Sequence, residues 1–127
     1  MVEMIDWAVG DAPLAGTAFA GTGLAAAIGN FDGVHRGHQK VVAAAVAAAR
    51  RDGLLPSVIT FDPHPREFFR QDDMPFHLTD RQEKDRLLGQ LAVDHIIHVT
   101  FDDALRRTDA EAFVTDILPA LGVRQLF

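Results

Sequence analysis

Two histidines, His35 and His38, lie three residues apart with Gly37 between them. They follow an apolar run at 24–28, which predicts a short buried strand, and precede an alanine-rich stretch at 39–51, which predicts a helix. Imidazole N–H groups donate hydrogen bonds to phosphate oxygens, and the start of a helix adds free backbone N–H groups and partial positive charge. The spacing therefore predicts a site for nucleotide phosphates in the turn between strand and helix.

Glycines surround this turn at positions 29, 33 and 37. Glycine lets a backbone approach a ligand closely or take a positive φ angle. Histidines at a helix start are also common as solvated or capping residues, and that alternative stays open for His35 and His38. The glycines on both sides favour the phosphate site.

Two segments carry a family resemblance. Residues 29–38, GNFDGVHRGH, resemble the HxGH signature of the nucleotidylyltransferase superfamily in the form found in prokaryotic FAD synthetases. Residues 60–69, TFDPHPREFF, resemble the second block of the same family, the FMN adenylyltransferase modules of bifunctional riboflavin kinase/FAD synthetases. The two blocks occur in the family's order, so together they are more specific than HxGH alone.

The resemblance implies that an FMN phosphate oxygen attacks the α-phosphorus of ATP, which gives FAD and pyrophosphate. The attacking phosphate is already ionised at neutral pH, so catalysis must come from alignment and charge neutralisation. Magnesium held mainly by the substrate phosphates and by water would bridge the anions, so no metal site built from protein side chains is expected. His35 and His38 would be the catalytic residues, stabilising the triphosphate in the transition state.

The same resemblance implies the binding residues. The residues expected at ATP are Gly29, Asn30, Phe31, Asp32, Gly33, His35 and His38. Pro63, Pro65 and Phe69 are expected to form an apolar wall for the flavin ring, a role that suits the stiff apolar face of proline. His64 lies between the two prolines, and for this residue a role only in shaping the turn is as well supported as a role in the site. Metal binding by His35, His38 and His64 is disfavoured because the chain has no cysteine.

Strand and helix patterns alternate along the chain, which predicts an α/β, Rossmann-like parallel sheet flanked by helices, incomplete at its C-terminal end. The predicted strands are 24–28, 56–61 and 93–101, with a possible edge strand at 4–7 and a strand cut short at 121–127. The predicted helices are 39–51, about 80–91, and one from 108 or 109 to about 119–122. A Phe-Asp pair lies at or just after the carboxyl end of each of these three strands, at 31–32, 61–62 and 101–102. Parallel strands share one ligand-binding edge, so both motif loops should meet there. Core packing is the expected role of these phenylalanines, with ligand contact as the alternative. His95 and His98 are expected to be structural residues that lie on opposite faces of the sheet.

The composition of the chain excludes several classes of protein and of functional site. The 127 residues suffice for one domain, and the absence of cysteine excludes disulfides, thiolate zinc sites and a cysteine nucleophile. No signal sequence or membrane-length apolar stretch is present, so a cytoplasmic protein without a membrane partner is expected. The net charge is −6, but residues 32–70 hold six Lys/Arg against four acids, about +2 between the two motifs. No basic stripe indicates a nucleic-acid partner.

The resemblance covers nearly the whole chain and stops at Phe127, whereas the family continues with further flavin and nucleotide motifs and usually a β-barrel riboflavin kinase domain. We therefore expect residues 1–127 to be the N-terminal portion of one FMN adenylyltransferase domain, with low or no activity alone and without riboflavin kinase. The alternatives are a non-catalytic nucleotide-binding or structural fragment, or a related transferase whose acceptor is pantetheine phosphate or nicotinamide mononucleotide. The sequence does not indicate an oligomeric state.

Overall fold

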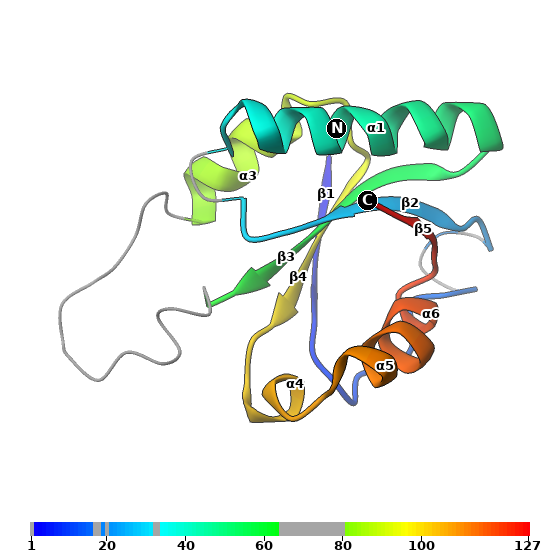
Figure 1. The fold of residues 1–127 in the computed structure, drawn as a ribbon, viewed down its shortest axis with the longest axis vertical. Coiled ribbons are helices and arrows are strands. Elements are labelled where there is room, and N and C mark those ends of the chain that lie inside the picture. The colour runs from blue at the N-terminus through cyan, green and yellow to red at the C-terminus, as the bar shows by residue number, and fades with distance from the viewer. Residues whose placement is uncertain (1, 17–18, 20, 32–33, 64–80) are drawn as a thin grey trace, which may run out of the picture.

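A five-stranded, all-parallel sheet forms the centre of the protein, with strand order β1-β4-β3-β2-β5 (Figure 1). The computed structural model describes residues 2–16, 19, 21–31, 34–63 and 81–127. The strands are β1 (Glu3–Trp7), β2 (Leu24–Ile28), β3 (Leu55–Asp62), β4 (His95–Thr100) and β5 (Val123–Leu126). This architecture confirms the predicted Rossmann-like fold, and β1 takes the edge position expected for 4–7.

Helices cover both faces of the sheet. On one face lie α1 (Arg36–Asp52) and α3 (Arg81–Gly89), and on the other lie α4 (Asp103–Arg106), α5 (Ala110–Ala112), the π-helical segment Phe113–Ile117 and α6 (Leu118–Ala120) (Figure 1). From β2 the chain adds β3 and then β4 in one direction, and it later returns to add β5 on the other side of β2. The strand order therefore reverses beside β2. The carboxyl end of the strand at such a reversal is where open α/β sheets bind ligands.

The interior strand β2, which pairs with β3 on one side and β5 on the other, is apolar throughout because both of its faces are covered. Leu24 and Ala25 to Ala27 are fully buried, as is typical of a central parallel strand. The small alanine side chains allow α1 to pack closely, and α1 buries its own alanines and valines at 42, 45, 46, 48 and 49. The position of α1 is therefore closely fixed over the strand that precedes the histidine turn.

Helix α1 begins earlier than the alanine pattern predicted, at Arg36 rather than residue 39. Its first turn contains glycine and histidine, which have low helix propensity, so the sequence pattern did not include it. The helix ends at Gly53, whose φ of 69° is the left-handed conformation of a common C-terminal cap. The histidine motif therefore belongs partly to the helix itself.

The helix predicted after residue 108 is divided in the structure. Asp109 caps it, since its carboxylate accepts a hydrogen bond of 2.8 Å from the backbone N–H of Ala112. Residues Phe113–Ile117 are then π-helical before Leu118–Ala120 complete the helix. The sequence also offers Thr79 or Asp80 as the N-cap of α3, and both residues lie outside the described part of the chain. Within the described part of the chain, no helix is long and apolar enough to cross a membrane.

Candidate functional site

The turn after β2 begins while the chain is still bound to the sheet. The N–H of Gly29 donates to the carbonyl of Ile59 on β3 over 3.1 Å. Phe31 and Val34 then have positive φ angles of 55° and 44°, which are unusual for residues with a side chain. Both side chains are buried, with 2% and 6% of their surface exposed, so core packing holds this strained turn in place. Asp32 and Gly33 lie outside the described residues.

The two motif histidines lie side by side at the start of α1. Their rings stack with centroids 3.8 Å apart and an interplanar angle of 22°. The ring of His38 also meets Phe31 edge-on, at a centroid distance of 5.2 Å. A Cβ atom at Gly37 would come within 3.2 Å of the His35 ring, so glycine leaves the space that this ring needs. The structure therefore brings together the two side chains predicted to bind phosphate.

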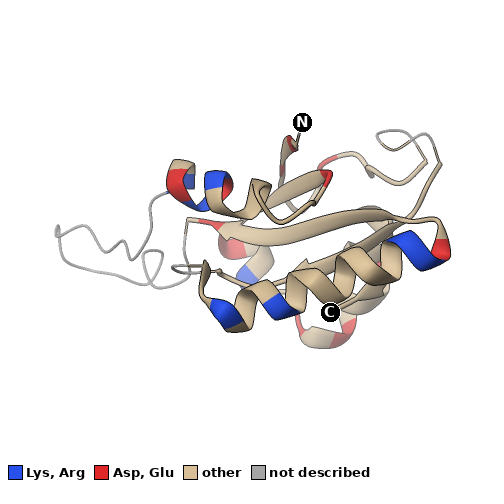
Figure 2. Ribbon diagram, turned by 90° about the horizontal axis from the view of Figure 1, so that it is seen from above, with Lys and Arg blue, Asp and Glu red and all other residues tan. Residues whose placement is uncertain are grey.

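The N-terminus of α1 suits an anion. His35 is its N-cap residue but makes no side-chain capping hydrogen bond, and the first turn has no acidic residue. The first half of this helix contains two basic residues, Arg36 and Lys40, and its ribbon is coloured accordingly in Figure 2. Backbone N–H groups, the helix dipole and the two cations therefore all favour an anion at this end of the helix.

Asn30 contributes two oxygen atoms with different surroundings. Its backbone carbonyl lies 3.4 Å from both Lys84 Nζ on α3 and Thr60 Oγ1 on β3. Its side-chain Oδ1 is buried and has no hydrogen-bond partner among the described residues. A buried oxygen without a donor, next to the histidine turn, is available to accept a hydrogen bond from a ligand.

Helix α3 directs polar side chains, Arg81, Lys84 and Asp85, onto the sheet. Arg81 donates to Asp62 over 2.7 Å and also pairs with Asp6. Residues at this i, i+3, i+4 spacing share one helix face. The same face carries the buried Leu88, which is the sequence signal that could have revealed this inward orientation.

Asp85 lies against His98, with Oδ1 and Nε2 separated by 2.9 Å, and His98 has only 1% of its side chain exposed. Burial lowers the pKa of His98 below its usual 6.5, against the opposing effect of the Asp85 charge. The ring of His95 instead packs on Phe19, in the core cluster on the other side of the sheet. His95 and His98 therefore pack against other side chains on opposite faces of the sheet, as predicted for structural residues.

An apolar pocket of about 370 Å³ lies at the carboxyl ends of the central strands. It is lined by Ile28, Phe61, Phe101, Leu105, Thr108, Asp109, Ala110, Phe113 and Val114. Phe61 and Phe101 meet edge-to-face with ring centroids 6.3 Å apart. Core packing, predicted for all three strand-end phenylalanines, describes Phe31 fully, whereas the other two also line this pocket. Sequence reasoning missed the pocket because its walls come from three separate stretches of the chain, at 28, 61 and 101–114.

Of the predicted flavin residues, the structure describes Pro63, which follows β3 two residues after Phe61. Pro65 and Phe69 lie outside the described residues, as does His64. Within the described ranges, no group of three or more His, Asp or Glu side chains is arranged to hold a metal ion.

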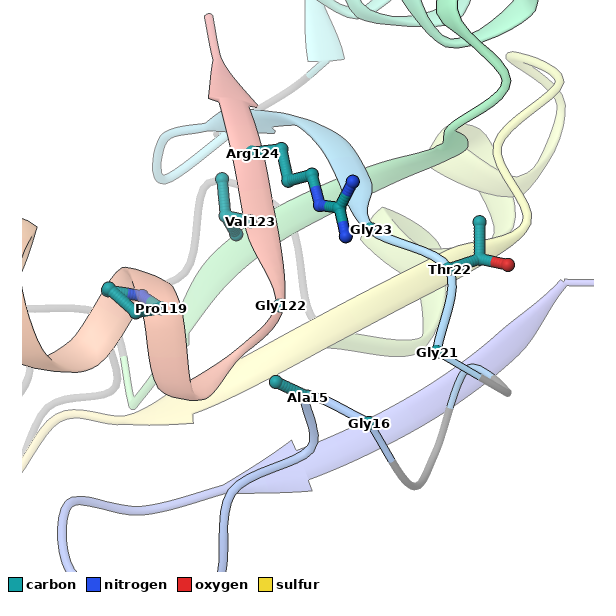
Figure 3. Close-up of a pocket in the computed structure, with 9 residues that line it drawn as sticks. All are labelled: Ala15, Gly16, Gly21, Thr22, Gly23, Pro119, Gly122, Val123 and Arg124. Carbon is teal, nitrogen blue, oxygen red and sulfur yellow. The ribbon is translucent and has the colours of Figure 1, made fainter.

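A second pocket, of about 260 Å³, lies at the opposite end of the sheet (Figure 3). Its lining consists of Ala15, Gly16, Gly21, Thr22, Gly23, Pro119, Gly122, Val123 and Arg124. Gly23 directly precedes β2 and Val123 begins β5, so this pocket lies at the amino ends of the strands. The Arg124 side chain passes over Gly23, where a Cβ atom would lie 2.6 Å from its Cδ.

A parallel sheet whose reversal point carries an HxGH turn and an uncapped helix start defines a Rossmann-like nucleotidylyltransferase fold. The sequence profile described as FAD synthetase matches residues 20–127. The chain belongs to the FAD synthetase family.

Similarity to individual proteins supports this membership. The bifunctional riboflavin kinase/FMN adenylyltransferase of Escherichia coli K12 is 40% identical over 91 residues, which are 72% of this chain and 29% of that protein. The protein of the same name from Pseudomonas fluorescens is 40% identical over 105 residues, 82% of this chain and 33% of the relative. The FAD synthetase of Listeria monocytogenes is 37% identical over 100 residues, 78% of this chain and 40% of the relative.

A solved structure has the same fold. The crystal structure described as a macrolide-efflux protein from Streptococcus pneumoniae aligns with a TM-score of 0.78 at 25% identity, covering 99% of this chain and 47% of that one. The present chain thus spans between 29% and 40% of the length of these curated relatives.

Proposed function

We propose that this chain carries the ATP-binding turn and part of the flavin pocket of an FMN adenylyltransferase, which transfers AMP from ATP to FMN. The observation that carries the proposal is the stacked pair His35 and His38 at the uncapped start of α1, beside the strand-order reversal. This position offers imidazole donors, backbone N–H groups and a positive dipole to one triphosphate.

In the proposed reaction an FMN phosphate oxygen forms a bond to the α-phosphorus of ATP. The bond between the α-phosphorus and the bridging oxygen to the β-phosphorus breaks, and pyrophosphate leaves with the electron pair. His35 and His38 donate N–H hydrogen bonds to phosphate oxygens and so offset charge that grows on the leaving group. ATP arrives as its magnesium complex, because Mg²⁺ prefers phosphates and water to a protein cage.

The adenosine end lies along the start of the turn in this proposal, at Gly29, Asn30 and Phe31, with Asp32 and Gly33 completing the segment. Support comes from Asn30 Oδ1, a buried acceptor without a donor among the described residues. An adenine amino group or a ribose hydroxyl would supply that donor.

The flavin ring occupies the apolar pocket at the same sheet edge. The pocket's volume of about 370 Å³ falls in the usual range for small-ligand sites. Phe61, Phe101 and Phe113 offer aromatic surfaces for a planar ring. Pro63, Pro65 and Phe69 remain part of the proposed flavin site, on the segment that follows β3.

Formation of FAD from ATP, Mg²⁺ and FMN, followed by chromatography, tests the activity. A transferase forms FAD with the parent chain, and His38→Ala lowers the rate by about 100-fold, the effect of losing one transition-state donor. Arg50→Ala, an exposed change at the other end of the same helix, serves as the control and leaves the rate unchanged.

Absence of FAD, with pantetheine phosphate or nicotinamide mononucleotide consumed instead, would contradict the assigned acceptor. Binding of ATP without turnover of any acceptor would favour the second candidate, a nucleotide-binding fragment.

A further inference from the structure

Lys84 is a buried lysine, with 7% of its surface exposed. Removing an ammonium group from water is unfavourable unless hydrogen bonds replace the lost hydration, so lysines are rarely found inside. Lys84 Nζ lies 3.0 Å from Thr60 Oγ1 and 3.4 Å from the carbonyl oxygen of Asn30. The charge is therefore directed at the first residues of the histidine turn.

The Asn30 carbonyl belongs to the peptide plane that enters the strained part of the turn. The next residue, Phe31, has a φ angle of 55° and a buried ring. That ring lies edge-on to His38 at 5.2 Å. Fixing the Asn30 carbonyl fixes one side of the Phe31 peptide, and Phe31 in turn supports one side of the His38 ring.

The lysine can fix this carbonyl because its own helix is held firmly on the sheet. One turn before it, Arg81 pairs with Asp62 at the end of β3, and the neighbouring Asp85 lies 2.9 Å from His98 on β4. Thr60 and His98 are register partners on adjacent strands. The polar face of α3 is thus anchored to β3 through Arg81 and to β4 through Asp85, and Lys84 lies between these two residues on the helix.

We infer that Lys84 is a positioning residue: through Asn30 and Phe31 it sets the orientation of His38 and thereby the strength with which the turn binds phosphate. The inference rests on the proposed function for its consequence in phosphate binding. Its structural part, the effect of Lys84 on His38, stands independently of which acceptor the protein uses.

The test compares Lys84→Met, which keeps an apolar stem of similar length, with Thr60→Val, which removes one acceptor with little change in shape. Arg86→Met is the matched control, because Arg86 lies on the same helix in an exposed pair with Glu83. Circular dichroism establishes that each variant is folded. The readouts are the NMR resonances of the His38 ring protons without ligand and the affinity for inorganic pyrophosphate by titration calorimetry.

We expect Lys84→Met to move the His38 resonances, since the Phe31 ring no longer shields them in the same way. Pyrophosphate should bind roughly tenfold more weakly, because small displacements of a binding group have effects of this order. Thr60→Val should change both readouts in the same direction, and Arg86→Met should change neither. If Lys84→Met does not fold, Thr60→Val alone decides the outcome.

Unchanged His38 resonances in the folded variants would overturn the inference. Shifted resonances in a protein whose parent form does not bind pyrophosphate would support the positioning role and contradict the proposed function. The positioning role of Lys84 and the proposed function can therefore be disproved independently of each other.

Discussion

Replacing Gly37 by alanine should stabilise the fold while weakening phosphate binding. Gly37 is in the first turn of α1, and glycine in a helix is about 1 kcal/mol less favourable than alanine. A Cβ atom there would lie 3.2 Å from Cε1 and 3.4 Å from Nδ1 of His35. These contacts are tighter than ordinary van der Waals distances, so the His35 ring must move by a few tenths of an ångström and leave its stack with His38.

The two effects have opposite signs and separate assays. We expect thermal unfolding of Gly37→Ala to shift upward by roughly 4 °C for about 1 kcal/mol in a domain of this size. A hydrogen bond to a charged phosphate is worth about 1.5–3 kcal/mol, so partial loss of the His35 contact should weaken pyrophosphate binding by about tenfold.

A double-mutant cycle isolates the cause. In a His35→Ala background the added methyl group has no ring to displace, so Gly37→Ala should then raise the melting temperature without further loss of pyrophosphate affinity. Equal losses of affinity in both backgrounds, or parent-like binding by Gly37→Ala, would show that displacement of the His35 ring does not weaken phosphate binding.

Two further predictions concern other parts of the molecule. Because the pKa of His98 is lowered by burial, the folded state opposes its protonation; Asp85, Arg81 and Lys84 provide the charges around it. The unfolding free energy measured in urea should be fully retained above pH 6.5 and should fall as the pH drops below 6.5 toward the folded pKa, and His98→Asn should flatten that dependence. If His98→Asn kept the pH dependence of the parent's unfolding free energy, groups other than His98 would be responsible for it. Phe113→Ala should weaken FMN binding, followed by flavin fluorescence, by roughly tenfold through lost aromatic contact while leaving ATP binding unchanged; equal losses for both ligands would indicate a general loss of structure.

Local patterns in the sequence predicted most of the sheet. Leu24–Ile28 is apolar throughout, and the apolar content of 93–101 places β4 within one or two residues of its observed ends. The histidine spacing and its glycines predicted the turn, and the structure brings His35 and His38 together. These features depend on neighbours in sequence, so the sequence alone contains the necessary signal.

Features that depend on distant segments were not predicted. Lys84 reads as an ordinary solvated charge until Thr60 and the Asn30 carbonyl are brought to it from elsewhere in the chain. The apolar pocket likewise requires three separate stretches of the chain to meet, and nothing local distinguishes Phe61 or Phe101 from a core residue. The π-helical Phe113–Ile117 also follows no simple sequence periodicity.

In the proposed function, the turn after β2 holds the triphosphate of ATP. We would titrate the chain with Mg·ATP and follow its ¹H–¹⁵N NMR spectrum, because this turn and the pocket at Gly21, Gly23 and Arg124 lie at opposite ends of the sheet and give separate signals. If ATP binds in this turn, backbone and imidazole signals between Gly29 and His38 shift. Shifts confined to Gly21, Gly23 and Arg124 at the amino ends of the strands would contradict it.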